Sequence, residues 1–449
     1  MNPRSSDPQP DALPAKLHPE IFCKLTLLNN HRFVNGDDAW YNKVDSNNLY
    51  GGIMKIILGT ESFIPNISGV AVATEILANN LVNSGNEVHV FCPGDGRDTY
   101  KDKTITKYPV LRLKSMVNPF RKGFRITSAS KNEIREQVKK INPDLIHLQD
   151  VATIGIMLRD VANELGIPVI ITNHFSLEFA LSYIKFKPLL PISRKILINY
   201  LVHFHNKCDV VVTPTETIAK QIRAWGVKTP VVAVSNGIFY DHFSVHVPKA
   251  DIEKFKEKYH LPENPIVLYT GRIDKDKSID VVMKAIPEVV KKTNAHFVLA
   301  GTGDLMQEME TLAESLGVRK DVTFLGRLDK ESPDFVALYK SASVFAIAST
   351  IETQSLVTLE AMSAGTPIVA ADANALPEIV RPGINGYLFR PGDDKAMAEY
   401  IIKILQNPKL AEDLSHGSQQ IASHHAMGKA FAAICELYKE TIAAHKKLS

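Results

Sequence analysis

Two acidic and two basic side chains have types and spacings suited to binding a ligand that carries phosphate and hydroxyl groups. In ASTIETQSLVTLEAMSAGTP, Glu352 and Glu360 are separated by seven residues, and TGRIDKDKSID contains Arg272 and Lys277. A guanidinium fork and an ammonium together suit a diphosphate, whereas carboxylate oxygens suit paired hydroxyls such as a ribose diol. Either pair alone is equally compatible with a solvated run of surface charge. The elements that carry the two pairs must therefore decide between these interpretations.

The first half of the chain alternates short apolar runs with longer amphipathic segments. From Met54, MKIILG is followed by the helix-like VATEILANNLVNSG and then by EVHVFC, which is a strand, helix, strand unit. The runs DLIHL, PVIIT, DVVVT and VVAV repeat this rhythm with helix-compatible sequence between them. The pattern predicts parallel strands joined by crossover helices.

The second half repeats this plan after a break. The stretch SNGIFYDHFSVHV interrupts the rhythm, and PIVLYTG, AHFVLAG, DVTFLG, SVFAIA and PIVAA then read as new strands. We therefore predict the α/β class, with two Rossmann-like doubly wound domains facing across a cleft. The predicted divisions are a flexible arm over 1–50, a first domain over 51–240, a second domain over 241–420, and a helix over 421–449 that docks back across the domains.

Several chemistry-bearing residues follow directly on predicted strands of the second half. Arg272 and Lys277 follow PIVLYT, Gly301 follows AHFVLA, and Glu352 follows SVFAIA. Because the carboxyl ends of parallel strands meet at one edge of a sheet, these side chains are expected to converge on one cleft. Ser355 is expected to cap the short helix that carries Glu360.

Composition and charge exclude several classes of protein. With 449 residues, 45% hydrophobic and 22% charged, the chain is long enough for two domain cores. A formal net charge of +3 is too small to indicate nucleic-acid binding. The four scattered cysteines predict neither a zinc site nor a disulfide framework. The polar start and the absence of a long apolar run favour a cytoplasmic protein without a signal peptide or membrane span.

The motifs of common cofactors are missing. The turn after MKIILG continues as TESFIPNISGV, which lacks G-x-G-x-x-G, and the chain contains no G-x-x-x-x-G-K-[ST] motif. Gly69 precedes a helix whose first backbone amides could approach a phosphate. Asp274 and Asp276 lie in the basic loop and are interpreted as loop charges instead of metal ligands. The sequence therefore predicts no cofactor and no metal.

These motifs together resemble a known enzyme family. GRIDKDKS, LAGTGD, FLGRL, STIETQSLVTLEAMSAGTPIVA and NGYLFRPGD resemble the donor-binding half of GT-B glycosyltransferases of family four. In the first half, SGVAVATEILANNLVNSGNEVHVFCP, PDLIHLQD, ITNHF and VVTPTETIAKQI follow the same family order, so the resemblance runs from Met54 to about Pro408. TNHF combined with ETQS is similar to diacylglycerol glucosyltransferases and related glycolipid-forming enzymes.

The resemblance implies that the domain over 51–240 binds the acceptor and that the domain over 241–420 binds the nucleotide sugar. It also implies a role for each matching residue. Arg272 and Lys277 are implied to bind the donor diphosphate, Glu352 the sugar and Glu360 the ribose, while His174 matches the family histidine near the transferred sugar. The predicted catalytic residues are His174, Arg272, Lys277 and Glu352. The predicted donor-binding residues are Gly69, Gly271, Arg272, Lys277, Gly301, Gly326, Arg327, Leu328, Glu352, Gln354, Ser355, Leu356 and Glu360.

The sequence departs from the family pattern at two places. Thr353, Gln354 and Ser355 stand where many members have an aromatic residue and a glycine, which leaves the identity of the sugar open. Gly69 is followed by Val70 where many relatives have a glycine pair.

The resemblance implies transfer of a hexose with retention of configuration. No carboxylate nucleophile is evident near the reacting carbon, so we favour front-face displacement in which the departing phosphate accepts the acceptor's proton. The first choice is glucose from UDP-glucose to diacylglycerol. The alternatives are mannose from GDP-mannose to a phosphatidylinositol-like lipid or to a soluble sugar, and a catalytically silent nucleotide-sugar-binding protein. The oligomeric state is not predicted.

Two basic and apolar segments favour a lipid acceptor. KYPVLRLKSMVNPFRKGFRI mixes both residue types, and the stretch 179–208 contains no acidic residue. Such composition suits a surface that meets anionic headgroups, although a basic patch over a helix bundle would have the same composition. We therefore expect peripheral attachment to the inner face of the cell membrane.

Overall fold

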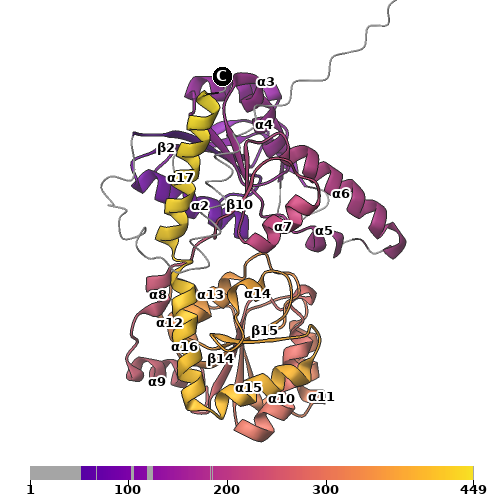
Figure 1. The fold of residues 1–449 in the computed structure, drawn as a ribbon, viewed down its shortest axis with the longest axis vertical. Coiled ribbons are helices and arrows are strands. Elements are labelled where there is room, and N and C mark those ends of the chain that lie inside the picture. Colours follow the sequence, from indigo (N-terminus) through magenta and orange to yellow (C-terminus); the bar gives the residue numbers. More distant parts are fainter. Residues whose placement is uncertain are drawn as a thin grey trace, which may run out of the picture.

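The computed structural model describes residues 52–66, 68–102, 106–118, 125–182, 184 and 186–447. The arm predicted over 1–50 lies outside these residues. Two α/β units, each built on its own sheet, follow one another along the chain (Figure 1). We call them the N-terminal unit and the C-terminal unit.

The N-terminal unit contains an eight-stranded sheet in the order β10-β9-β8-β7-β1-β2-β4-β3. Neighbouring strands run parallel except for β3 with β4. In the register, Ile56 of β1 pairs with Val88 on one side and Leu145 on the other. The bounds are β1 Lys55–Gly59, β2 Glu87–Pro93, β3 Tyr100–Asp102, β4 Val110–Leu113, β7 Leu145–Leu148, β8 Val169–Thr172, β9 Val210–Thr213 and β10 Val231–Ala233, with a separate hairpin of β5 Ser115–Val117 and β6 Arg125–Thr127.

Helices cover this sheet on both faces, which is why its inner strands are mainly apolar. Every residue of β7, β8 and β9 is buried, as expected for parallel strands enclosed on two sides. Two apolar clusters form the core, one on each face. The helices are α2 Gly69–Asn83, α3 Lys131–Ile141, α4 Thr153–Leu165, α5 Leu177–Ser182, α6 Leu190–His205 and α7 Glu216–Ala224, with the 3-10 turn η2 over Lys187–Leu189.

The C-terminal unit contains a six-stranded, fully parallel sheet in the order β13-β12-β11-β14-β15-β16. The chain starts at β11 in the middle, proceeds outward to β13, and returns to the other side of β11 with β14. In such a doubly wound sheet, ligands bind outside the carboxyl ends of the two strands where the order reverses. The bounds are β11 Ile266–Thr270, β12 His296–Ala300, β13 Val322–Gly326, β14 Ala342–Ile347, β15 Ile368–Ala371 and β16 Gly386–Phe389.

A single large apolar cluster forms the core of the C-terminal unit. The 3-10 turn η3, over Lys275–Lys277, lies just beyond β11, and α13 follows β14. The remaining elements around this sheet are α8 Tyr240–Ser244, α9 Lys249–Lys258, α10 Ile279–Thr293, α11 Met306–Ser315, η4 Arg319–Asp321, α12 Pro333–Lys340, α13 Leu356–Ser363, α14 Leu376–Ile379, α15 Asp394–Leu405 and α16 Pro408–Ser423.

The chain crosses between the units twice, at neighbouring places. Ile238 donates its backbone N–H to the carbonyl of His425 (2.9 Å) and accepts from the N–H of Met427 (2.8 Å). The last helix, α17 (Met427–Lys446), then lies along the N-terminal unit (Figure 1). Its Tyr438 is fully buried in the N-terminal core, and its hydroxyl is 2.6 Å from Nδ1 of His147.

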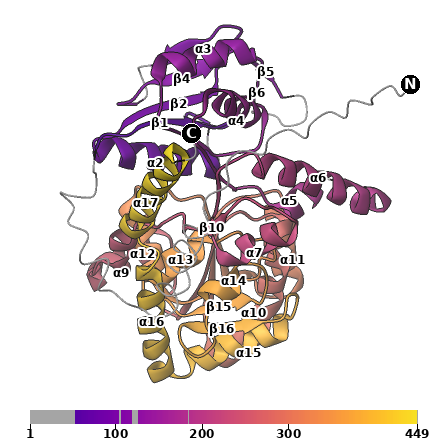
Figure 2. The ribbon, with the colours of Figure 1, turned by 45° about the horizontal axis from the view of Figure 1, so that its top comes forward.

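Helix α6 projects from the side of the N-terminal unit (Figure 2). No helix in the described part of the chain is long and apolar enough to span a membrane. The first basic segment of the sequence, 107–126, is described only in part.

Candidate active site

The loop after β11 is shaped by contact with the loop after β12. Gly271 donates its backbone N–H to the carbonyl of Ala300 (3.0 Å), and Ile273 donates to that of Thr302 (3.0 Å). A Cβ on Gly301, whose φ is +154°, would lie 1.7 Å from the carbonyl oxygen of Gly271. Glycine at 301 is therefore required because the backbone of the neighbouring loop approaches it closely.

The guanidinium of Arg272 lies in this loop among carboxylates. It donates to Asp274 and to Asp276, whose Oδ2 is 3.0 Å away, while the side chain is 53% exposed. Asp274 also accepts from the backbone N–H of Asp304 at 2.9 Å. The two aspartates therefore orient Arg272 and the neighbouring loop, and Arg272 presents a partly exposed cation at the carboxyl end of the sheet.

Lys277 and Glu352 meet at the point where the strand order reverses. Lys277 ends the 3-10 turn η3 beyond β11, and Glu352 follows β14, the neighbour of β11. The Nζ of Lys277 is 2.8 Å from Oε1 of Glu352 and 3.3 Å from Asp276, with only 16% of the lysine side chain exposed. This largely enclosed ammonium is thus paired with two carboxylates, and an anionic ligand group would bind it by replacing one of them.

Glu360 is buried on helix α13, in the C-terminal unit. Its Oε2 accepts a 2.6 Å hydrogen bond from the Tyr339 hydroxyl, and its Oε1 is 3.4 Å from Nζ of Lys330. Burial raises the pKa of Tyr339 well above its ordinary value, and the Glu360 charge adds to this shift. The phenol therefore remains a donor that holds the carboxylate in place.

Other predicted donor residues lie on separate loops or helix starts. Gly326 is the last residue of β13, the exposed Arg327 follows it, and Leu328 packs against the C-terminal core. Leu356 is the 40% exposed first residue of α13. Gly69 begins α2 in the N-terminal unit, where the preceding Ser68 caps the helix by accepting from Ala71 N–H at 3.1 Å.

Two of the predicted donor residues have side chains that face elsewhere. The Oε1 of Gln354 accepts from Asn236 N–H at 3.0 Å, and its Nε2 donates to Oγ of Ser235 at 2.6 Å. Ser355 stands at the cap position of α13, but its hydroxyl bonds to Thr358 and no backbone amide, so the expected side-chain cap is wrong. With a φ of +71°, Ser355 turns the chain into the helix instead.

His174 follows β8 in the N-terminal unit. Its Nε2 is 3.0 Å from Oε1 of Gln149, which follows the neighbouring strand β7. Burial lowers the pKa of His174 to about 4, so the imidazole is neutral at physiological pH. A neutral ring in this place can donate or accept a hydrogen bond without carrying charge.

A cavity lies between the segment after His174 and the loop that bears Glu352. It is lined by Phe175, Ser176, Leu177, Glu178, Ile218, Gln221, Ile351, Glu352, Thr353 and Asn374. The N-terminal unit thus contributes one wall and the C-terminal unit the other. The structure therefore places Lys277 and Glu352 next to each other and brings the His174 segment to the opposite side.

Sequence reasoning missed a pair of carboxyl groups at the centre of the N-terminal sheet. Glu61 follows β1 and Asp150 follows β7, and the Glu61 N–H donates to Asp150. Burial, with the Asp150 charge, raises the pKa of Glu61 to about 7. Glu61 also accepts from the backbone N–H groups of Thr127 and Ile154, so the pair ties three loops together. The sequence did contain a signal for this pair, because each acid closely follows a predicted strand.

Family models match both α/β units, and they identify a sugar-transferring enzyme. The protein-family model for "Glycosyl transferases group 1" matches residues 251–420, and the family model for "Glycosyltransferase Family 4" matches residues 67–241. The chain belongs to the GT-B glycosyltransferases of family four, and the expected enzyme class is confirmed.

Similar proteins extend over most of the chain. It is 29% identical over 353 residues to an alpha-monoglucosyldiacylglycerol synthase of Streptococcus pneumoniae, covering 77% of each chain. A synthase of the same name from Acholeplasma laidlawii is 26% identical over 406 residues, and the alignment spans 88% of this chain and 99% of the synthase.

Solved structures confirm the predicted fold class. The Anabaena HepE protein in complex with UDP superposes with a TM-score of 0.69 at 19% identity, over 86% of this chain and all of that one. Sucrose-phosphate synthase of Thermosynechococcus elongatus gives 0.67 at 21% identity, over 87% of this chain and all of that one. At these identities the likeness concerns the fold alone.

Proposed function

We propose that this protein is a retaining hexosyltransferase that moves glucose from UDP-glucose to a membrane lipid such as diacylglycerol. The observation that supports this most is the Lys277–Glu352 pair at the switch point of a doubly wound sheet. The choice of acceptor is supported by the similarity to two alpha-monoglucosyldiacylglycerol synthases, one of them spanned almost completely.

In the proposed reaction, Arg272 and Lys277 stabilise charge on the departing nucleoside diphosphate. The bond from the sugar carbon to the phosphate oxygen breaks as the acceptor oxygen attacks from the same face, and the departing phosphate takes the acceptor's proton. Glu352 exchanges its bond with Lys277 for contacts to the sugar hydroxyls, and the neutral His174 hydrogen-bonds the sugar. The scheme requires no metal, and it takes place in the cytoplasm.

Two other functions make different predictions. A GDP-mannose-dependent enzyme acting on a phosphatidylinositol-like lipid or a soluble sugar would bind the donor diphosphate with the same residues, Arg272 and Lys277. A silent binding protein would bind a nucleotide sugar without forming a product. A thermal-shift panel of UDP- and GDP-sugars, followed by mass spectrometry of lipid products, separates the three. Stabilisation by a donor with only slow hydrolysis across all lipids would contradict the lipid proposal.

Glu360 provides a test of the nucleotide site. Glu360→Gln is expected to weaken UDP binding by about tenfold, because a charged acceptor for the ribose hydroxyls becomes neutral. Titration calorimetry with UDP measures the effect, and Glu399→Gln, at an exposed position on α15, serves as the matched control. Equal affinities for the wild type and both variants would remove Glu360 from the ribose site.

The face of α6 and the preceding turn supports the membrane part of the proposal. Phe186, Leu189, Ile192 and Ile196 are all about half exposed or more, the two isoleucines at 60% and 62%. Ile192 and Ile196, four residues apart, lie on one face of α6, and Phe186 and Leu189 belong to the turn before the helix. Lys195 is exposed beside them, and no acid occurs from 179 to 208. Arg194 of the same helix is paired with Glu178 at 2.6 Å, so Lys195 is the basic charge beside the apolar side chains. Exposed apolar side chains with a lysine beside them suit an anionic bilayer surface.

The double substitution Ile192→Ser/Ile196→Ser tests this surface. We expect at least tenfold less protein to float with vesicles containing anionic lipid, because two exposed apolar side chains no longer enter the bilayer. Ile384→Ser, at a 49% exposed position in the C-terminal unit, is the control. Equal recovery of the wild type with anionic and neutral vesicles, or of the wild type and the double variant, would contradict the membrane proposal.

A further inference from the structure

One carboxylate of the C-terminal unit binds the start of a helix in the N-terminal unit. Glu378 lies on α14, just after β15. Its Oε1 accepts from the backbone N–H of Glu216, and its Oε2 accepts from both the N–H and the hydroxyl of Thr217, each at 2.9 Å. Three hydrogen bonds thus join residues about 160 positions apart in the sequence.

The partners of Glu378 are the first two backbone amides of helix α7. These amides have no acceptor within a helix, and the helix dipole makes this end favourable for a negative charge. The helix also has an internal cap, because Thr215 Oγ1 accepts from the N–H of Ile218. Since Thr215 serves Ile218, the Glu216 and Thr217 amides must find their acceptor elsewhere, and in this structure it is Glu378.

A second bond between the units is located beside the first. The hydroxyl of Thr215 donates to the carbonyl of Thr353 at 2.9 Å, in the loop that bears Glu352. Within the C-terminal unit, Nδ2 of Asn374 donates to the carbonyl of Thr350 at 2.6 Å. The segment leading into α14 is thereby tied to the Glu352 loop, and both are tied to the start of α7.

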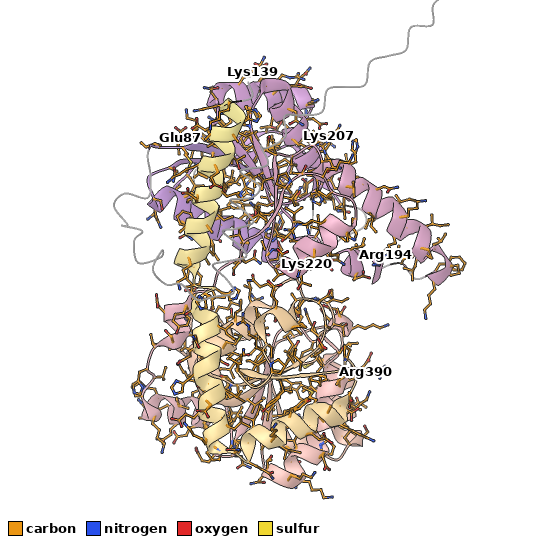
Figure 3. All side chains as sticks on the ribbon, viewed as in Figure 1. Glu87, Lys139, Arg194, Lys207, Lys220 and Arg390 are labelled. Carbon is orange, nitrogen blue, oxygen red and sulfur yellow. The ribbon has the colours of Figure 1, made fainter. Side chains whose placement is uncertain are left out.

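These bonds lie at the edge of the cavity between the units. Ile218 and Gln221 of α7 line it together with Glu352, Thr353 and Asn374. Figure 3 shows Lys220, also on α7, on the side of the N-terminal unit that faces the other unit. The separation between α7 and the Glu352 loop therefore sets the width of the cavity.

We propose that Glu378 is a positioning residue that holds the cavity closed by binding the first amides of α7. Its carboxylate does not contact Arg272 or Lys277, which are proposed to bind the diphosphate. It also does not contact the residues proposed to bind the sugar. It acts by fixing the distance between the C-terminal residues Lys277 and Glu352 and the segment that follows His174. Only the kinetic readout of this inference depends on the proposed function.

Hydrogen exchange tests the contact without any substrate. In Glu378→Ala, the amides at the start of α7 lose their acceptor, so exchange in a peptide spanning 214–222 is expected to accelerate at least tenfold. Glu399→Ala, at an exposed position on α15, is expected to leave this exchange unchanged. Equal exchange in Glu378→Ala and the wild type would overturn the proposal.

A substitution on the other side of the contact separates it from a folding defect. Glu216→Pro removes one amide donor while preserving the helix, because proline suits the first helical position and Thr215 already has the extended backbone that precedes a proline. Glu216→Ala is the matched control, since it also loses the 2.6 Å ion pair with Arg223 but keeps the amide.

Kinetics then connects the contact to transfer. We expect Glu216→Pro to lower kcat/KM at least fivefold relative to Glu216→Ala, with UDP affinity changed less than twofold. In the Glu378→Ala background, proline and alanine at 216 are expected to give equal rates. A difference that persists there would overturn the proposal. If the wild type transfers no sugar from any nucleotide donor, the proposed function fails, while the exchange experiment still decides the role of Glu378.

Discussion

Replacing Lys277 with alanine is expected to lower kcat by about 100- to 1,000-fold, the range seen when a preorganised donor to developing charge is removed. The ammonium lies 2.8 Å from Glu352 at the carboxyl end of the sheet, where the proposed diphosphate leaves. Its partners are Asp276 in the same 3-10 turn and Glu352 in the loop after β14, and the β11 strand before it is fully buried. We therefore expect the melting temperature to change little.

The control is Lys275→Ala, because Lys275 is an exposed lysine two positions away in the same 3-10 turn. It should retain nearly the wild-type rate. Steady-state kinetics with UDP-glucose and a lipid acceptor, together with scanning fluorimetry, measures both quantities. If Lys277→Ala lost activity only in proportion to a fall in melting temperature, Lys277 would be a structural residue.

A loss of stability is expected as the pH falls from 6.5 towards 4, because the lowered pKa values of four histidines outnumber the raised pKa values of Glu61 and Asp150, which act in the opposite direction. Burial lowers the pKa of His147 to about 3 and that of His174, His205 and His425 to about 4. In the unfolded chain each imidazole takes up a proton near pH 6.5. Folding must then remove that proton, which costs about 1.4 kcal/mol per histidine for each pH unit below 6.5.

The sign follows from the direction of these shifts. A group whose pKa is lower in the folded state stabilises the fold fully above its unfolded pKa, and this contribution is lost as the pH falls towards the folded pKa. Stability should therefore be constant with respect to these groups above about pH 7 and should decline below it. Denaturant unfolding at pH 7.5, 6 and 5 measures the decline.

His205 offers the cleanest variant for this test. Neither of its ring nitrogens has a hydrogen-bond partner among the described residues, and the side chain is fully buried beside Phe204. In His205→Leu, the free energy of unfolding should fall less steeply below pH 6.5, because one histidine no longer takes up a proton on unfolding. The substitution should not lower stability at pH 7.5. The exposed His416→Gln is the control. An unchanged acid decline in His205→Leu would show that this imidazole is already protonated in the fold.

Much of the architecture is predictable because it depends on local pattern and on one rule of topology. Strands such as β9, with the sequence VVVT, are almost entirely apolar because both faces are buried. The convergence of Lys277 and Glu352 follows from parallel strands that end at one edge, although 75 positions separate the two residues. Neither inference requires knowledge of how the two units dock.

The remaining features depend on that docking and are not evident from the sequence. Gln354 occupies a position beside Glu352 that suggests ligand contact, yet its amide bonds to Ser235 and Asn236 at the crossing between the units. Glu378 lies on a four-residue helix with no distinctive spacing. The partners of both residues are more than 100 positions away, and only the assembled structure brings them together.

The position of α17 has a consequence for how the chain is made. Cys435, Leu437 and Tyr438 belong to the core of the N-terminal unit, although nearly the whole C-terminal unit precedes them in the sequence. During synthesis the ribosome releases the strands of the N-terminal sheet first and the helix that covers them last. The C-terminal unit can therefore complete its own core while the N-terminal unit still exposes apolar surface, which makes the earlier half of the chain the later one to mature.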